Sequence, residues 1–277
     1  MTNYKLHPWN ETFEWGDAVT RSGYLTEDQI NKYNNDGFVL LEKALDITKL
    51  KEITESMDQL ASETDAFLLT LEGERLSIAE SGAILFVIHP CLRSEMVKQF
   101  ISRQPFADIC HDLIGPDVRL YWDQLVYKQT EKPRRFPWHQ DNGYGFVEPQ
   151  QYLTCWIPLV DVHIENGCPW IVPKVHQRGT LSHEYVDPLG YECFNDHPDA
   201  IPVEAEAGSI VIFSSLTPHK TGPNVSEETR KAYIVQYAPD EAQLLHGEPH
   251  AGPPESKVLA NESDRQFPIL IDGAVAN

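Results

Sequence analysis

The order of residue patterns along the chain constrains its fold more than any single motif does. Helical periodicity dominates the first part of the chain, and short β-branched and aromatic runs dominate from Val118 onward. The first of these runs, Val118–Lys128, is partly alternating. Helices followed by many short strands indicate an α+β fold, with the strands in a sandwich or barrel of jelly-roll type.

Two helix starts can be read from their capping residues. Thr26 is a good N-cap, and Gln29 completes a capping box, so we expect a helix from there to about Gly37. Asp46 starts a second helix, with apolar residues at helical spacing (Leu50, Ile53, Met57 and Leu60). Further helices are predicted over 94–101 and 105–114. The apolar run 83–88 fits a helix or a strand.

Strands are predicted at 38–41, 118–128, 152–159, 170–172, 201–204, 209–213 and 232–237. Turn signals such as Asn166-Gly167 separate them. We interpret 1–277 as one domain with an N-terminal arm (1–25), a core (26–237) and a C-terminal tail (238–277). The tail carries few apolar residues, so we expect it to be irregular and to cover one edge of the domain.

Composition limits the class of partner and the cellular compartment. The formal charge is −20, from 42 acidic and 22 basic residues, which argues against nucleic-acid and anionic-membrane partners. The opening Met1–Pro8 lacks the apolar core of a signal peptide, and no apolar run reaches transmembrane length. The five cysteines are odd in number and form no C-x-x-C, which is typical of reduced thiols in a cytoplasmic protein. Monomer and homodimer both stay open.

Four histidines stand two residues before an acid: His139/Asp141, His163/Glu165, His197/Asp199 and His246/Glu248. Chance alone predicts 11 × 42/277, or about 1.7, such pairs, so the pair by itself decides nothing. His139 and Asp141 differ because an extended segment carries them into the strand-rich region. Residues i and i+2 of an extended chain point to the same face, so both side chains can reach one metal.

Two downstream residues complete a candidate site. The predicted strand 209–213 leads to Pro218-His219, and Arg230 lies on the next strand, after a turn-rich connection. Two imidazoles and one carboxylate (His139, Asp141 and His219) would occupy one face of an octahedron, as in non-haem Fe(II) oxygenases. Arginine suits the anchoring of a dicarboxylate cosubstrate because its guanidinium is planar, charged and bidentate.

These residues resemble the phytanoyl-CoA dioxygenase family of Fe(II)/2-oxoglutarate oxygenases. The set His139-x-Asp141, His219 and Arg230 is similar to the family pattern, as are Asp36-Gly37-Phe38-Val39 and the run from Asn166 to His176. The resemblance covers roughly residues 26–237. It implies a double-stranded β-helix (jelly-roll or cupin-like) core with flanking helices, Fe(II), 2-oxoglutarate as cosubstrate, and O2.

The resemblance also assigns cosubstrate residues. It implies that Arg230 pairs with the far carboxylate of 2-oxoglutarate, assisted by Thr221, and that Trp156, Lys128 and Gln140 line the cosubstrate pocket. From the residues alone, Trp156 could equally be core and Lys128 a surface strand residue. Decarboxylation of 2-oxoglutarate to succinate and CO2 would drive hydroxylation of a substrate C–H. Related halogenases lack the carboxylate ligand, so Asp141 favours hydroxylation.

Substrate-facing candidates are Tyr144, Phe146, Trp138, Asp123, Phe136 and the loop 183–194. Plain core packing is the alternative for the aromatic residues. The chain shows no basic cluster suited to a coenzyme A phosphate tail. A small amine-bearing or zwitterionic metabolite is therefore our hypothesis for the substrate, motivated by the acidity of the chain and by Asp123.

Two other classes of function fit parts of the pattern. One is a non-catalytic jelly-roll binding protein, and the other is a cupin-like metal-dependent isomerase or hydrolase with the same ligands. Neither requires a carboxylate anchor such as Arg230 beside the metal, so that residue discriminates between the readings. Motifs of other chemistries (G-x-S-x-G, the P-loop and G-x-G-x-x-G) do not occur.

Overall fold

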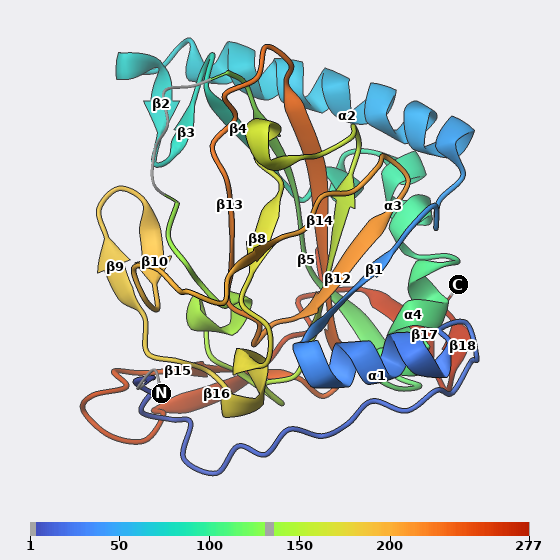
Figure 1. Cartoon of the computed structure of the whole chain (residues 1–277), viewed down its shortest axis with the longest axis vertical. Coiled ribbons are helices and arrows are strands. Elements are labelled where there is room, and N and C mark those ends of the chain that lie inside the picture. Colours follow the sequence, from blue (N-terminus) through green and yellow to red (C-terminus); the bar gives the residue numbers. More distant parts are fainter. Residues whose placement is uncertain (1–3, 131–135, 277) are drawn as a thin grey trace.

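Most of the strands belong to one antiparallel sheet, which forms a wall of the fold (Figure 1). The computed structural model describes residues 4–130 and 136–276. The main sheet runs in the order β1 (Phe38–Leu41), β12 (Ile210–Ser214), β7 (Leu153–Pro158), β14 (Arg230–Pro239), β5 (Val118–Lys128), β4 (Ile84–Ile88), β3 (Ala79–Glu80) and β2 (Arg75–Leu76). Strands far apart in sequence are thus neighbours, as in a jelly roll.

A smaller antiparallel sheet shares a core with one face of the main sheet. Its strands are β11 (Ile201–Pro202), β8 (Pro169–Ile171) and β13 (His219–Thr221). The shared cluster, called the inner core below, consists of Phe38, Ile84, Val126, Trp156, Val162, Cys168, Ile171, Val203, Val211, Phe213, Ala232 and Ile234. Two antiparallel sheets around one core form the double-stranded β-helix, which confirms the predicted fold class.

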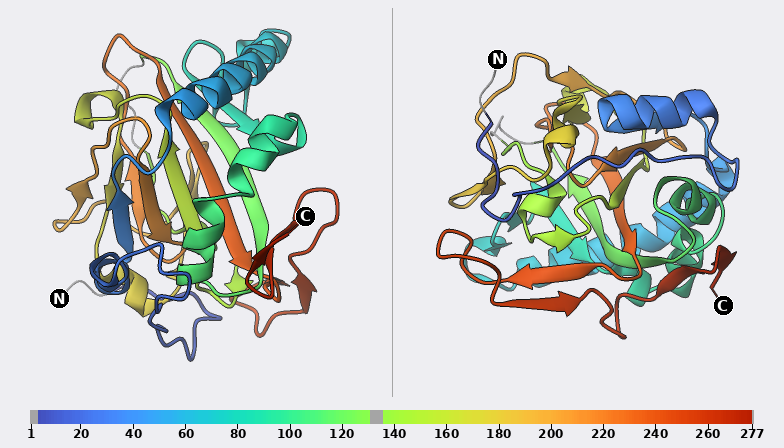
Figure 2. Two further views of the ribbon diagram at one scale, coloured as in Figure 1. Left: turned by 90° about the vertical axis from the view of Figure 1, so that its right-hand side faces the viewer. Right: turned by 90° about the horizontal axis from the view of Figure 1, so that it is seen from below.

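Helices cover the other face of the main sheet (Figure 2, left). They are α2 (Ile47–Leu68), α3 (Glu95–Ile101) and α4 (Phe106–Leu113), while α1 (Glu27–Asp36) contacts β1. Their apolar residues join the outer face of the sheet in a second cluster, the outer core, which includes Ile53, Met57, Cys155, Ile212 and Val235. Side chains alternate between the two cores along each strand, as the pleat of a β-strand requires.

Local chemistry explains where the first helices begin. Thr26 accepts a hydrogen bond from the backbone of Gln29, and the Gln29 side chain accepts one from the backbone of Thr26, which confirms the predicted capping box. The helix ends at Gly37, whose φ of 81° is a left-handed conformation that favours glycine. Asp46 caps α2 through the backbone N–H of Lys49. The ambiguous run 83–88 is a strand, β4.

The prediction of an irregular tail is wrong. Residues beyond Pro239 form β15 (Gln243–His246), β16 (Ser256–Leu259), β17 (Pro268–Ile271) and β18 (Ala274–Val275). β17 pairs with the start of β5, at Val118 and Arg119, so the tail adds a strand to the main sheet there. β15 pairs with β16 on one side and with β6 (Val147–Glu148) on the other. All four side chains of β16 are exposed, so backbone pairing creates this strand without an apolar pattern in the sequence.

The remaining elements are short. They are the hairpin β9 (Glu184–Val186) and β10 (Gly190–Glu192), and the 3₁₀ turns η1 (Glu72–Glu74), η2 (Pro90–Leu92), η3 (Asp141–Gly143), η4 (Ile164–Asn166) and η5 (Val175–Arg178). None of the helices in the described part of the chain has the length and apolarity needed to cross a membrane. All five cysteines are free thiols.

Candidate metal centre

Side chains from two segments that are distant in sequence, His139 with Asp141 and then His219, meet beside the inner core. The backbones of His139 and His219 form two reciprocal hydrogen bonds, of 3.0 and 2.8 Å, and their ring centroids lie 4.3 Å apart. Asp141 follows at the start of η3. The potential ligand atoms of the three residues all lie within 4.8 Å of one another. The structure therefore brings together the three residues that the sequence singles out as a facial triad.

Hydrogen bonds orient the donor atoms of this triad. Nδ1 of His139 lies 3.1 Å from the carbonyl oxygen of Pro137, and Nδ1 of His219 lies 3.0 Å from that of Thr217. A carbonyl oxygen can only accept, so each Nδ1 carries the proton and each Nε2 keeps its lone pair for a metal. Burial holds the pKa of His139 well below its usual value, which keeps that imidazole neutral.

The carboxylate of Asp141 is oriented as well. Its Oδ2 accepts a hydrogen bond of 2.5 Å from Oγ1 of Thr154 on β7, and its Oδ1 lies 3.7 Å from Nε2 of His219. One oxygen is thus held by the protein while the other faces the histidines. Two neutral nitrogens and one carboxylate oxygen form the donor set of non-haem Fe(II) sites, so the residues present fit this metal.

Arg230 lies on the inner face of β14, in register with Lys128 of β5. Its side chain is 1% exposed, and its guanidinium carbon lies 5.5 Å from the ring centroid of Trp156. Trp156 stands two residues after Thr154, on the same face of β7. Trp156, which packs beside Arg230, and Thr154, whose hydroxyl donates to Asp141, therefore lie on the same inner face of β7.

Two other cosubstrate candidates lie beside this region. Lys128 is buried and donates a hydrogen bond of 2.9 Å to the carbonyl of Gly222, so the surface alternative for this lysine is wrong. Its Nζ also lies 3.1 Å from the ring centroid of Phe136. Thr221 stands two residues after His219 on β13 and therefore shares its face.

Gln140 does not face the metal centre, which contradicts the cosubstrate role implied for it. Its amide nitrogen donates to the carbonyls of Gly179 and Leu216, and its amide oxygen accepts from the backbone N–H of Leu181. The physical reason is alternation: a residue between two side chains on one face of an extended segment points to the other face. Gln140 thus ties together the loops behind the ligands.

Trp138 points away from the triad for the same reason, so its predicted substrate contact is wrong. It is fully buried in a separate apolar cluster with Val172, Val175 and Leu181. It also borders a cleft of about 580 Å³ that Lys220 lines too. Lys220 alternates with His219 on β13, which places this cleft on the opposite side of the small sheet.

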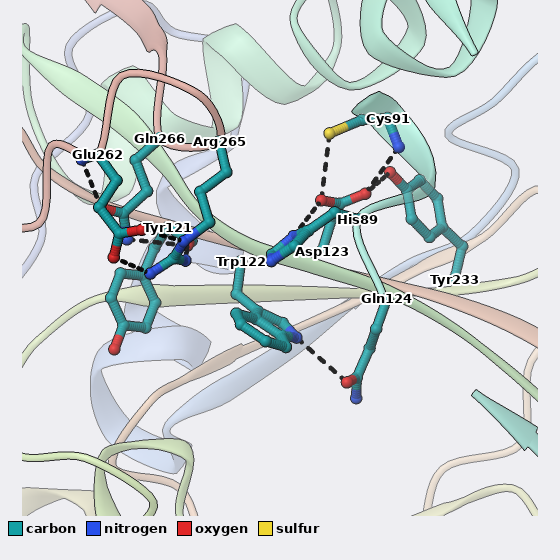
Figure 3. A network of polar contacts seen from close by, with 10 residues as sticks. All are labelled: His89, Cys91, Tyr121, Trp122, Asp123, Gln124, Tyr233, Glu262, Arg265 and Gln266. Carbon is teal, nitrogen blue, oxygen red and sulfur yellow. Dashed lines mark hydrogen bonds and ion pairs between the residues drawn. The ribbon is translucent and has the colours of Figure 1, made fainter. Parts of the chain in front are cut away.

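Two more substrate candidates are placed elsewhere by the structure. Phe146 is buried under the N-terminal arm, with its ring 4.6 Å from that of His7 and 5.8 Å from that of Trp9. Asp123 is fully buried on the outer face of β5, where it accepts hydrogen bonds from groups that include the Tyr233 hydroxyl (Figure 3). Neither residue presents a free surface to a substrate, so both predictions are corrected.

Tyr144 is a substrate candidate that contacts a ligand directly. Its ring stands edge-on to that of His139, with centroids 5.2 Å apart, yet the residue is 52% exposed. On its other side it contacts Tyr191 of β10, at 5.4 Å between centroids. The predicted loop 183–194 thus reaches the triad through a row of aromatic rings.

His183, the first residue of the loop predicted to face the substrate, instead supports the ligand segment, a role that the sequence did not indicate. Its Nε2 accepts from the backbone N–H of Gln140, and its Nδ1 donates to the carbonyl of Leu181. Burial lowers the pKa of His183 to about 4, so the ring stays neutral. A Cβ on Gly143 would lie 2.2 Å from this ring, so glycine is required there. No spacing rule indicates this contact in the sequence.

Comparisons with known proteins agree with this geometry. Residues 33–232 match the family described as phytanoyl-CoA dioxygenase (PhyH). A methylphosphonate hydroxylase of Gimesia maris is 26% identical over 226 residues, which cover 77% of this chain and 80% of that protein. An ectoine dioxygenase of Bordetella parapertussis is 23% identical over 236 residues, which cover 77% of this chain and 75% of that protein.

A solved structure shows the same fold. The epimerase SnoN, in complex with Fe3+, alpha ketoglutarate and nogalamycin RO, superposes with a TM-score of 0.66 at 21% identity, covering 88% of this chain and 98% of that one. The family match spans most of the chain, and the donor set of the triad fits iron. The chain therefore belongs to the phytanoyl-CoA dioxygenase family, and it is an Fe(II)- and 2-oxoglutarate-dependent dioxygenase.

Proposed function

We propose that His139, Asp141 and His219 hold Fe(II), and that the protein hydroxylates an unactivated C–H of a small metabolite. The observation that carries this assignment is the convergence of two Nε2 lone pairs and one carboxylate oxygen within 4.8 Å. Bound Fe(II) and 2-oxoglutarate would supply the oxidation: one oxygen atom of O2 enters succinate, the other enters the substrate, and CO2 leaves.

The residues around the triad would bind and orient 2-oxoglutarate. Arg230 has the planar, bidentate donor geometry that a carboxylate requires, and its burial strengthens that pairing. Trp156 packs beside the guanidinium and excludes water from it. Thr221 on β13 of the small sheet and Lys128 on β5 of the main sheet would contribute further hydrogen bonds to the same pocket.

The test is optical and needs no substrate. Anaerobic addition of Fe(II) and 2-oxoglutarate to the wild-type protein should produce a weak visible charge-transfer band. We expect His219→Ala to abolish the band, because two ligands remain, and His163→Ala, which changes a histidine outside the triad, to preserve it. Absence of the band in the wild type, or its survival in His219→Ala, would overturn the assignment.

We further propose that the substrate is small and zwitterionic or amine-bearing. The names of the two relatives, a methylphosphonate hydroxylase and an ectoine dioxygenase, support a small polar molecule. The net charge of −20 is compatible with a cationic group, whereas Asp123 no longer supports one, because it is buried on the outer face.

A substrate panel separates the alternatives. Methylphosphonate, ectoine, other small zwitterions and an acyl-coenzyme A thioester would each be added to the Fe(II)- and 2-oxoglutarate-loaded protein, and succinate would be measured. We expect a small zwitterion to stimulate succinate formation. Stimulation by the acyl thioester alone, or by methylphosphonate alone, which carries no amine, would contradict this substrate class.

A further inference from the structure

The inner face of the main sheet is open to solvent at one end, beyond the metal centre. Ile88 ends β4 in register with Gln124, and it is 54% exposed although it belongs to an apolar strand. Gln124 and Trp122, both on the inner face of β5, are partly exposed. The indole N–H of Trp122 donates to the amide oxygen of Gln124, at 3.1 Å. This open end therefore presents a tryptophan and an amide rather than a sealed apolar wall.

Strand register connects this open end to the metal ligands. Trp122 pairs with Gln236, and Gln236 pairs with Thr154, whose hydroxyl holds Asp141. These side chains form one row across the inner face. With about 4.8 Å between adjacent strands, Trp122 lies roughly 10 Å from Thr154. A small molecule could therefore contact Trp122 at one end and place a C–H near the metal at the other.

His89 packs against Trp122 (Figure 3). The two ring centroids lie 4.3 Å apart at an edge-on angle, and the side chain of His89 is 16% exposed. Its Nδ1 lies 3.1 Å from Oδ1 of Asp123, which fixes the orientation of the ring. The backbone of His89 has φ 52°, a left-handed conformation that is costly for a residue other than glycine. Strain of this kind collects at functional sites.

Asp123 is well suited to position this histidine. Besides His89, its carboxylate accepts hydrogen bonds from the backbone N–H of Cys91, at 3.1 Å, and from the hydroxyl of Tyr233, at 2.8 Å. The thiol of Cys91 lies 3.1 Å from Oδ1 as well. A fully buried carboxylate with this many donors cannot rotate, so the imidazole bound to it is held in one orientation.

Arg265 also contacts Trp122. Its guanidinium carbon lies 5.7 Å from the indole centroid, and it donates to Glu262, three residues earlier in the same loop, and to the carbonyl of Tyr121. The loop is fixed to the edge of β5, because Gln266 donates to the carbonyl of Tyr121, at 3.2 Å, and β17 continues the sheet from there. The C-terminal tail thus delivers a cation to the open end of the inner face.

We propose that His89 and Arg265, which both contact the ring of Trp122, bind an anionic oxygen group of the substrate, either a carboxylate or a phosphonate. The guanidinium of Arg265 suits the paired oxygens of either group. Nδ1–H of His89 already donates to Asp123, so His89 would contact the anion through Nε2–H of the doubly protonated ring. Glu262 occupies Arg265 when no substrate is bound, and an arriving anion would share or replace it. Asp123 would act as a positioning residue for His89. The proposal rests on the proposed function, because the opposite end of the substrate must reach the metal.

Binding measurements test this subsite independently of turnover. Methylphosphonate and ectoine would be titrated by calorimetry into the anaerobic protein loaded with Fe(II) and 2-oxoglutarate, so that the phosphonate and carboxylate arms are separate. We expect at least one probe to bind the wild type. Arg265→Gln and His89→Asn should each raise its Kd about tenfold or more, because each removes a charge-assisted or oriented hydrogen bond.

Matched controls separate binding from folding. Arg93→Gln removes an exposed arginine that pairs with Glu63, and it should leave the Kd unchanged. Ile212→Ala in the outer core, which does not contact Asp123, should lower thermal stability while the Kd stays the same. Asp123→Asn should raise the Kd in the wild type and have no further effect in the His89→Asn background. That pattern identifies positioning, which general destabilisation would not reproduce.

Two results would overturn the subsite: neither anion binds the wild type, or the folded Arg265→Gln and His89→Asn variants bind as the wild type does. The charge-transfer band keeps this outcome separate from the proposed function. A protein that forms the band but binds neither anion retains the metal assignment and loses the subsite. A protein without the band that still binds an anion through Arg265 retains the subsite and loses the metal assignment.

Discussion

The two faces of the main sheet differ in chemistry although the same strands supply both. On β14, Val235 faces the apolar outer core under the helices, whereas Arg230 and Gln236 face the inside of the jelly roll. On β7, Cys155 lies in the outer core, whereas Thr154 faces inward and holds Asp141. Alternation along a strand thus separates the residues that stabilise the fold from those that bind ligands.

This difference predicts that the two faces respond differently to substitution. Inner-face polar residues contribute few apolar contacts, so their loss should affect iron or cosubstrate binding more than stability. Substitutions in the outer core can affect ligand binding only by changing the stability or shape of the fold. Asp123 is the exception, because it is a polar group in the outer core that reaches the inner side through His89.

The largest effect should come from the metal ligands. We expect His219→Ala to lower 2-oxoglutarate turnover by at least about a thousandfold, since a bound metal contributes several kcal/mol and each 1.4 kcal/mol is a factor of ten. Iron content after anaerobic desalting and succinate formation are the measurements. Thermal stability of the metal-free protein should change little. If His219→Ala still bound stoichiometric iron, the division between a ligand-binding inner face and a stabilising outer face would be wrong for the most important inner residue.

Residue spacing predicted the three metal ligands. The same spacing rule was not applied to the directions of the side chains beside them. The rule that places His139 and Asp141 on one face also places Gln140 on the other, and applying it there would have excluded Gln140 and Trp138. Asp123 is a different case. Both faces of β5 are largely buried, so an alternating pattern cannot tell which face is inside the jelly roll.

The fold was predictable where local chemistry decides it. The capping box at Thr26 and the apolar spacing of α2 are local signals, and both helices form where they indicate. β13 was missed because its residues are polar and it forms by pairing with the distant β8, and β16 was missed because all its side chains are exposed. β17 was missed although Ile269 and Leu270 are buried apolar residues, because so short a run gives no period. Thr154 and His183 were missed because their roles depend on contacts across 13 and 43 residues.

The next effect concerns the cosubstrate. Arg230→Gln should raise the KM for 2-oxoglutarate about a hundredfold or more, since losing one partner of a buried, charged pair costs about 2–5 kcal/mol. The KM of Arg230→Lys should lie between those of the wild type and Arg230→Gln, because lysine keeps the charge and loses the bidentate geometry. Iron affinity without 2-oxoglutarate should be unchanged. An equal loss of iron in both variants would show that Arg230 supports the triad instead.

The outer core should give the opposite result. Ile212 on β12 is fully buried against the helices, so Ile212→Ala should lower the free energy of unfolding by about 2–5 kcal/mol. Ile201→Ala, at a partly exposed site, should change it by less than about 0.5 kcal/mol. Denaturant titration measures both. The folded Ile212→Ala protein should retain wild-type affinities for iron and 2-oxoglutarate, and a changed affinity would show that the faces are coupled.

The smallest effect tests the hydroxyl behind the metal ligand. Thr154→Val keeps the shape of the side chain and removes the donor to Oδ2 of Asp141. Partners that orient a metal ligand typically contribute 10–100-fold in metal affinity, so we expect the Kd for Fe(II) to rise by roughly that factor. Thr154→Ser, which keeps the hydroxyl, should stay near the wild type. Valine is also accepted in a strand, so the free energy of unfolding should change little. If Thr154→Val and Thr154→Ser had the same Kd for Fe(II), backbone geometry alone would orient Asp141. Metal binding would then depend less on the polar residues of the inner face than the comparison of the two faces implies.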